Sequence, residues 1–441
     1  TVTDEHDPVM NQFLQNNTIM SSIKLDREPA PKYTTEQPST SQELNKEDDI
    51  PAWICSKLQQ APLYGIPRVT GELCEKYIWS NKDLEENEFS LKKDPIRSMA
   101  YHPHRNMIAF ADENDIVYVY EKKEKADGWS RKVLTHQFMR NITCIEWKKR
   151  ARGTLAVGCQ KGVCVWNIGH ESSGADNVDS TSMNYLCSPG HENISSIGWD
   201  PTPGSHLLAV TSGTISTIMV YDTLSLSTMP LKRIGKGNLL LRWSPSGRWI
   251  YVATKSGTSR MWDTLDWTYK ELNNPPGLWV QSACWAPNSR SLLISMHGKS
   301  DVHMIYWASS SNAAEICHEK VYSAVPAPDN VTGDDAYVGD SIKELVLCPD
   351  TGRRLAVIFD NSPTIALYAV DVDSPLTLKN KSALTKIGNI HNTLVNLPNL
   401  STSLDSNRKP VHISLSTRFT TSNTLATLYD NDIVNFTPII P

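Results

Sequence analysis

The 441-residue sequence lacks the patterns that most often indicate chemistry or membrane insertion. It contains no H-E-x-x-H, no G-x-S-x-G and no C-x-x-C motif, which argues against the metalloproteases, serine hydrolases and zinc ribbons that those motifs mark. No apolar run is long enough to span a bilayer, and no signal peptide is visible. We therefore expect contact with a membrane only through a protein partner.

The nine cysteines are odd in number and show no paired spacing, which predicts free thiols in a reducing compartment. Three of them lie within apolar runs and are predicted to be small buried hydrophobes: Cys159, Cys164 and Cys284. No metal site is predicted from the cysteines.

Charge of one sign is concentrated in one part of the chain. Residues 1–95 hold 10 Lys+Arg and 17 Asp+Glu, a net charge of −7, whereas the rest holds 33 against 31, or +2. The first part is acidic and the remainder is close to neutral. This balance predicts no direct binding of nucleic acid.

What the sequence does contain is a repeated pattern of short strands, clearest in residues 238–264. The apolar run 239–243 stops at a Ser-Pro-Ser-Gly turn, and the runs 249–253 and 259–263 follow, separated by Ser-Gly. Three strands in succession cannot bury both of their faces, so such a unit needs neighbours.

The neighbouring units share two positions about twenty residues apart. The first position, often followed by x-Pro, is occupied by Tyr101, Trp147, Trp199, Trp243, Trp285, Leu347 and Leu415. The second lies near the end of a later strand and is occupied by Tyr120, Trp166, Tyr221, Trp262, Tyr306, Tyr368 and Phe436. The first positions are 42 to 68 residues apart, at or above the ~40–45 of a four-stranded blade.

Seven such units predict an all-β fold, a seven-bladed WD40-type β-propeller, because closing a ring removes exposed sheet edges. A β-sandwich with coincidental aromatics is the alternative. Residues 1–49 are predicted to be a disordered acidic arm without a specific apolar contact. Residues 50–95 are predicted to be partly ordered and to pack on the propeller, which occupies residues 96–441.

The last unit lacks a fourth strand of its own, since only a proline-containing tail follows Phe436. We expect part of Ile50–Asn81 to provide that outer strand, within Leu63–Val69 or Glu75–Trp79. Longer insertions are expected at Gly169–Ser188, Ala308–Asp340 and Asp371–Pro410.

Two short motifs could be considered as sites. Gly235-Lys236-Gly237 lacks the spacing of a phosphate loop and predicts a turn between blades. His102 and His104 have no Cys or carboxylate at zinc-ligand spacing and predict a solvated turn. The sequence thus predicts no catalytic, cofactor-binding or metal site, no small-molecule ligand, and a binding scaffold rather than an enzyme.

Several of the repeats resemble the aladin family of WD-repeat nucleoporins. The resemblance is carried by residues 101–104 (YHPH), by residues 155–166, by residues 189–191 (PGH) ahead of Trp199, and most specifically by NLLLRWSP at 238–245 running through to Trp267. It implies a non-enzymatic scaffold of the nuclear pore complex, anchored at the nuclear envelope by a transmembrane nucleoporin, contacting other pore components and supporting selective protein import and mRNA transport.

Two other classes of function are weighed against this one. A WD-repeat substrate receptor of a cullin-type ubiquitin ligase often carries an Arg two residues after its Trp-Asp pair, and here Trp262-Asp263 is followed by Thr264-Leu265. A propeller enzyme would need acidic or His residues converging at the mouth of the ring. The sequence supports neither of these as well as it supports the scaffold.

Overall fold

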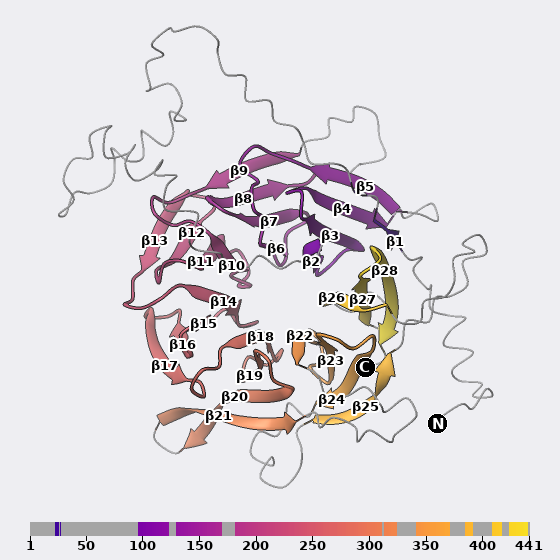
Figure 1. The fold of residues 1–441 in the computed structure, drawn as a ribbon. Helices are drawn as coiled ribbons and strands as arrows, with labels where there is room; N and C mark the ends of the chain where they lie inside the picture. The colour runs from indigo at the N-terminus through magenta and orange to yellow at the C-terminus, as the bar shows by residue number, and fades with distance from the viewer. Residues whose placement is uncertain are drawn as a thin grey trace, which may run out of the picture. The chain divides into compact units, whose positions relative to one another are not determined.

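The computed structural model of the protein describes residues 23–25, 27, 96–122, 129–169, 181–310, 313–323, 341–370, 384–390, 408–416 and 423–439. In these ranges every regular element is a β-strand, and the strands form seven four-stranded antiparallel sheets. Figure 1 shows the sheets as blades arranged in a ring. The predicted seven-bladed propeller is therefore confirmed. No helix in the described part of the chain is long and apolar enough to cross a membrane.

Each blade runs from a first strand at the centre of the ring to a fourth strand at the rim (Figure 1). Blade 1 comprises β2 (Ile96–Tyr101), β3 (Met107–Asp112), β4 (Val117–Lys122) and β5 (Trp129–Leu134). Blade 2 comprises β6 (Cys144–Trp147), β7 (Thr154–Cys159), β8 (Gly162–Asn167) and β9 (Ser182–Leu186). Blade 3 comprises β10 (Ile194–Trp199), β11 (Leu207–Ser212), β12 (Ile218–Asp222) and β13 (Ser227–Leu231).

The remaining blades follow the same order, with one exception at the end. Blade 4 comprises β14 (Asn238–Trp243), β15 (Trp249–Thr254), β16 (Thr258–Asp263) and β17 (Thr268–Asn273). Blade 5 comprises β18 (Val280–Trp285), β19 (Ser291–Met296), β20 (Asp301–Ser310) and β21 (Ala313–Ser323). Blade 6 comprises β22 (Ile342–Leu347), β23 (Arg354–Phe359), β24 (Ile365–Val370) and β25 (Leu384–Ile390). Blade 7 comprises β26 (Pro410–Leu415), β27 (Asn423–Tyr429), β28 (Ile433–Ile439) and, at its rim, β1 (Ile23–Lys24).

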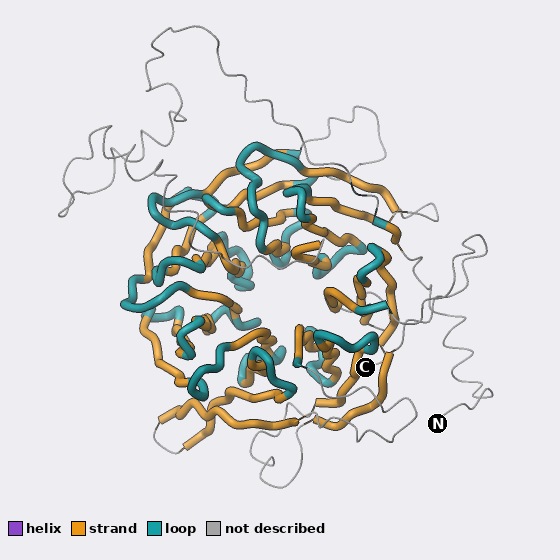
Figure 2. The backbone as a smooth tube through the Cα atoms, in the orientation of Figure 1, coloured by secondary structure: helices purple, strands orange, loops and turns teal. Residues whose placement is uncertain are grey.

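The ring is closed by its first strands, because each contacts the first strand of the next blade and β26 contacts β2. Figure 2 shows these strands around the centre, with the loops joining the blade ends. The first of the two repeated sequence positions is always the last residue of this strand, from Tyr101 in β2 to Leu415 in β26. The second position always lies in the third strand, from Tyr120 in β4 to Phe436 in β28.

The hydrophobic core consists of seven layers, and each layer lies between two neighbouring blades. Between blades 1 and 2, for example, Val117 and Met107 pack with Trp147 and Leu155. Equivalent clusters fill the other six interfaces. Apolar surface is thus buried between blades all around the ring, so each blade depends on its neighbours to cover its faces.

The predicted insertions are only partly loops. Strand β9 lies within Gly169–Ser188, β21 and the end of β20 lie within Ala308–Asp340, and β25 lies within Asp371–Pro410. These are outer strands, which have one face toward solvent and therefore a weak apolar pattern. In β17, for instance, five of six residues are exposed.

The source of the seventh blade's outer strand differs from the sequence prediction. Ile23 pairs with Val434 and Lys24 with Ile433, so the strand comes from within residues 1–49, and not from Leu63–Val69 or Glu75–Trp79. The side chains of Ile23 and Leu25 are buried in the cluster between blades 7 and 1. The arm therefore does make a specific apolar contact. Residues 50–95 and the rest of the arm lie outside the described residues.

Candidate binding surfaces of the ring

His102 is a buried structural residue, contrary to the predicted solvated turn, whereas His104 is exposed. The Nε2 of His102 lies 3.1 Å from the Ala151 carbonyl oxygen, and its Nδ1 accepts a hydrogen bond from the His104 N–H at 3.1 Å. Burial lowers the pKa of His102 to about 4, so its ring is neutral at physiological pH. With both nitrogens engaged, this ring is not placed to bind a metal. In the described ranges no group of three or more His, Cys, Asp or Glu could hold one.

The Gly235-Lys236-Gly237 motif forms part of the link from β13 to β14, as the predicted turn between blades. A Cβ atom at Gly237 would lie 1.9 Å from the Gly213 carbonyl oxygen, so only glycine fits at this close approach of two backbones. Packing of the link against the neighbouring turn accounts for the glycine without any phosphate.

The described cysteines are free. Cys159 and Cys164 are buried as predicted, whereas Cys284 is half-buried. Cys144 and Cys284 lie on first strands, where burial raises their pKa values to about 11 and about 12. These two thiols stay protonated at neutral pH and are poor nucleophiles.

Tryptophan indoles connect the first strands of successive blades. In each case the donor is the tryptophan that ends the first strand of a blade, through its Nε1–H. The acceptor is the carbonyl oxygen of the second-to-last residue in the first strand of the preceding blade. These bonds are Trp147 to Ala100 (3.0 Å), Trp199 to Glu146 (3.2 Å) and Trp285 to Arg242 (3.1 Å). Trp243 instead donates to Gly247 in its own turn at 2.8 Å. Both Trp243 and Trp285 are buried, as predicted.

Serine hydroxyls make a second series of bonds at the centre of the ring. The Oγ atoms of Ser98, Ser282 and Ser414 accept backbone N–H groups of the adjacent blade: Ile145 (3.3 Å), Leu345 (3.1 Å) and Tyr101 (3.3 Å), respectively. These three serines therefore join neighbouring blades at the centre of the ring.

The two ends of the blades form two distinct surfaces. The upper face is the end that carries the turns between the second and third strands of each blade. It also carries the links from one blade to the next. The lower face carries the other turns. Backbone hydrogen bonds connect the upper loops in series: Gln160 N–H to Arg140 (2.8 Å), Asn193 N–H to Gln160 (2.5 Å) and Gly213 N–H to Asn193 (2.9 Å).

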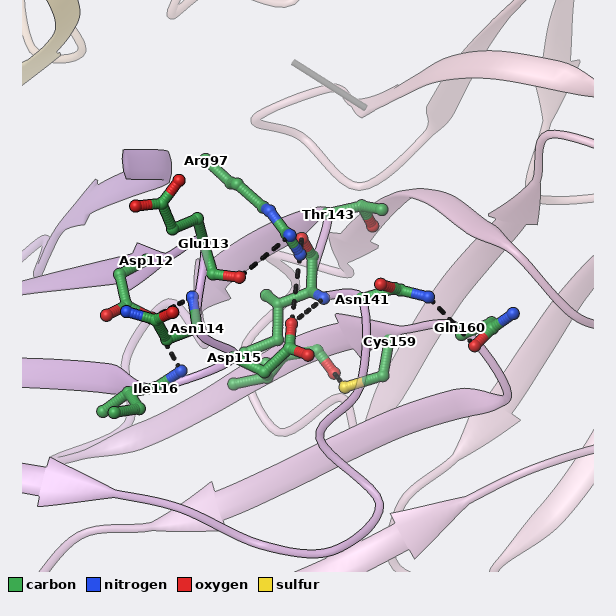
Figure 3. Close-up of polar contacts among 12 residues, drawn as sticks. Arg97, Asp112, Glu113, Asn114, Asp115, Ile116, Asn141, Thr143, Cys159 and Gln160 are labelled. Atoms are coloured by element: carbon green, nitrogen blue, oxygen red, sulfur yellow. Dashed lines mark hydrogen bonds and ion pairs between the residues drawn. The ribbon is translucent and has the colours of Figure 1, made fainter. Parts of the chain in front are cut away.

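Arg97 fixes the upper loops of blades 1 and 2 against each other (Figure 3). Its Nη1 donates to Asp115 Oδ1 at 3.0 Å and to the Ile142 carbonyl at 3.2 Å, and its Nη2 donates to the Glu113 carbonyl at 3.0 Å. Asp115 Oδ1 also accepts the Ile142 N–H at 3.0 Å. Sequence reasoning did not single out this network, because its members are separated by up to 45 residues.

Arg27 makes a similar junction between blades 7 and 1. Its Nη2 lies 2.6 Å from Asp432 and its Nη1 lies 3.5 Å from Glu113, while the Leu25 N–H donates to the Asp432 carbonyl at 2.9 Å. The segment around β1 is therefore held by apolar, backbone and ionic contacts together.

Charge on the upper face is distributed unevenly. The upper turns of blades 7 and 1 carry Asp430, Asp432, Glu113 and Asp115. On blades 3 to 5, by contrast, five upper loops contain five Lys or Arg and no Asp or Glu: residues 213–217, 232–237, 255–257, 274–279 and 297–300. We call this second region the basic face. The link that enters blade 3 carries one acidic residue, Glu192.

The lower face presents exposed leucines on two adjacent blades. Leu224 and Leu265 are 73% and 75% exposed at the turns before the fourth strands of blades 3 and 4. Each turn is closed by the preceding Asp, since Asp222 Oδ1 accepts the Leu224 N–H at 2.9 Å and Asp263 Oδ1 accepts the Leu265 N–H at 3.0 Å.

Comparison with known proteins agrees with this architecture. The WD40 family (WD domain, G-beta repeat) matches residues 240–263, in blade 4. Aladin of Arabidopsis thaliana is 25% identical over 289 residues, which are 61% of this chain and 62% of that protein. The match thus spans less than two thirds of the relative. Protein transport protein SEC31 of Chaetomium globosum is 23% identical over 199 residues, 41% of this chain and 15% of that protein. The crystal structure of Sqt1 from Chaetomium thermophilum has a TM-score of 0.51 and 13% identity, over 79% of this chain and 97% of that one.

The fold and the repeat define the chain as a WD-repeat β-propeller. Among WD-repeat proteins, its sequence is similar to that of Aladin.

Proposed function

We propose that the protein is a non-enzymatic scaffold of the nuclear pore complex, located at the nuclear envelope and supporting transport of proteins and mRNA between nucleus and cytoplasm. The observation that carries this proposal is the similarity to Aladin over 61% of the chain. The geometry supports it, because a ring of blades joined by contacts such as those of Trp147 and Ser98 presents its loops as surfaces for partner proteins.

A transmembrane nucleoporin is the anchor that we propose. Since β1 already supplies the outer strand of blade 7, the apolar residues of Ile50–Asn81 are not needed for that strand. Their large apolar side chains, among them Trp53 and Trp79, are suited to a protein-binding segment. We propose that this segment contributes to binding the envelope anchor.

The test is the location of the fluorescently tagged full chain in living cells, together with cross-linking on isolated nuclear envelopes. We expect a continuous nuclear rim and cross-links to a membrane-spanning pore protein. A chain without residues 50–81 should retain its circular dichroism spectrum and lose the rim. Diffuse signal from the full chain, or co-purification with a cullin, would contradict the proposal.

A further inference from the structure

The basic face consists of loops of three consecutive blades, whose residues 181–310 are described without interruption. Lys232, Lys236, Lys255 and Lys299 are exposed, and no ion pair connects them to another described residue. Arg233 is half-buried and donates to Asn238 Oδ1 at 2.6 Å and to the Lys236 carbonyl at 2.7 Å. Four cationic side chains therefore face solvent without a counter-charge from the described part of the ring.

One acidic group lies on a neighbouring strand. Glu271, on β17, is paired with Arg260 at 2.5 Å and also acts on Arg233, so a single carboxylate is shared by two guanidinium groups. Charges of like sign that are grouped on one surface raise the local potential and attract a partner of opposite charge. The basic face is thus electrostatically complementary to an acidic ligand.

Apolar side chains lie among these cations. Ile234 is 96% exposed in the same link as Lys232 and Lys236. Pro275 and Pro276 are exposed in the next link, and exposed apolar groups grouped in this way are typical of protein-binding sites. An occupant should therefore combine negative charge with apolar side chains.

Trp279 is held in a fixed position within the basic face. The ring of His297 stacks on it at a centroid distance of 4.3 Å and an angle of 15°, and Lys255 Nζ lies 5.8 Å from its centroid. The His297 N–H also donates to the Trp279 carbonyl at 2.9 Å. An indole already stacked in this way is less available to nucleobases, which disfavours single-stranded nucleic acid as the occupant.

We propose that the basic face binds an acidic polypeptide segment of a partner protein, with its carboxylates near Lys232, Lys236 and Lys255 and a large apolar side chain against Ile234. Each exposed ion pair contributes little by itself, so several must act together and the affinity should fall with salt. This inference does not rest on the location of the protein at the nuclear envelope.

The probe is a fluorescein-labelled peptide of twelve residues in which Glu and Asp alternate with Leu and Phe. Binding to the purified full chain is measured by fluorescence anisotropy at low and high salt. Control probes are a peptide with Gln and Asn in place of the acids, a peptide with Ser in place of Leu and Phe, and a single-stranded oligonucleotide of equal charge. We expect the acidic apolar peptide to bind most tightly and to lose about tenfold in affinity at high salt.

Charge-reversal variants locate the site. Lys232→Glu, Lys236→Glu and Lys255→Glu together should weaken binding about tenfold or more, and Ile234→Ser should weaken it several-fold. The matched control reverses three exposed arginines of the lower face, Arg150→Glu, Arg290→Glu and Arg353→Glu, and should change the affinity less than about twofold. Unchanged melting temperatures identify folded variants.

Four outcomes would overturn the inference. They are equal binding of the neutral peptide, equal loss in the lower-face control, tighter binding of the oligonucleotide, and a dimer of the wild-type chain that the lysine substitutions dissociate. Because the test uses purified protein, its result is separate from that of the localisation experiment.

Discussion

At the scale of single residues, three indole N–H groups connect neighbouring blades. Each of three tryptophans packs its ring in an inter-blade core and donates its N–H to the preceding blade. The acceptor matters because an unpaired N–H in the core costs free energy. These residues therefore combine apolar burial with a directional contact.

Trp285 allows the two contributions to be separated. Trp285→Ala should lower the free energy of unfolding by about 3–5 kcal/mol, the usual cost of truncating a large buried side chain. Trp285→Phe keeps most of the apolar volume, loses the bond to Arg242, and should cost clearly less. Urea unfolding followed by circular dichroism measures both, with the exposed Leu265→Ala as a control expected within about 0.5 kcal/mol. An unchanged Trp285→Ala protein would show that the indole is not part of the inter-blade core.

His102 gives the stability a defined dependence on pH. Its folded-state pKa is about 4, lowered chiefly by burial, against about 6.5 in the unfolded chain. The unfolded state therefore binds a proton first as the pH falls. The contribution of this residue is fully present above pH 6.5 and is lost as the pH approaches 4.

The corresponding experiment compares wild type with His102→Gln in urea at several pH values between 7 and 4. The wild-type free energy of unfolding should fall more steeply with decreasing pH than that of the variant. His191, whose pKa burial also lowers to about 4, contributes in the same direction in both proteins. Parallel pH profiles would rule out His102 as the titrating group.

At the scale of elements, the blades share a feature that does not appear as a sequence motif. In six blades the pairing of the first and second strands is irregular near the upper end of the first strand, as between Ile194 and Ser196. Such irregularities bend a strand and redirect its side chains. In blades 1 and 5 the residue just after the irregularity is the serine that bonds to the next blade, Ser98 or Ser282.

Strand β1 is expected to contribute to the free energy of unfolding although it is very short. Ile23 and Leu25 together bury two large side chains, worth about 3–6 kcal/mol before the entropy of ordering the segment is subtracted. A chain that begins at residue 28 should therefore be less stable by about 2 kcal/mol or more. A chain that begins at residue 22 keeps β1 and should match the full protein.

Thermal unfolding of these two truncations tests the role of β1. A point variant, Ile23→Asp, disrupts the same contact without changing the chain length. Its melting temperature should therefore fall as that of the chain that begins at residue 28 does. Equal melting temperatures for both truncations would contradict the closure of blade 7 by β1.

At the scale of the whole molecule, apolar clusters fill all seven interfaces between blades, and one of these interfaces depends on residues from the two ends of the described chain. The cluster between blades 7 and 1 contains Ile23, Leu25, Ile108 and Phe436. Loss of this cluster opens the ring and exposes sheet edges, so its effect should extend beyond blade 7.

The ring is also expected to hold its structure without a metal. Treatment with a chelator should leave the melting temperature of the full chain unchanged, because in the described residues no cluster of ligands suits a cation. Elemental analysis of the purified protein provides an independent measurement. A stoichiometric metal, or a lower melting temperature in chelator, would contradict this expectation.

The sequence by itself determined the repeat, the number of blades and the positions of the first and third strands. These features are local: an apolar run, a turn with Pro or Gly, and an aromatic such as Trp243 or Trp262 at its end are all read within one unit. The absence of catalytic motifs was equally local. The likeness to aladin could be inferred from the same residues.

Only the tertiary structure decided what closes the ring and which charges share a surface. Two residues, Ile23 and Lys24, form a strand because β28 offers an unpaired edge more than 400 residues away in sequence. A two-residue strand is too short to show an alternating pattern of apolar and polar residues. The prediction therefore placed the outer strand in the longer apolar stretch at 50–81. Likewise His102 contacts a neighbouring blade through Ala151. Lys232, Lys255 and Lys299 share one face only because successive blades present their upper loops on the same side of the ring. Contacts of this kind depend on how the units pack, and no single unit encodes them.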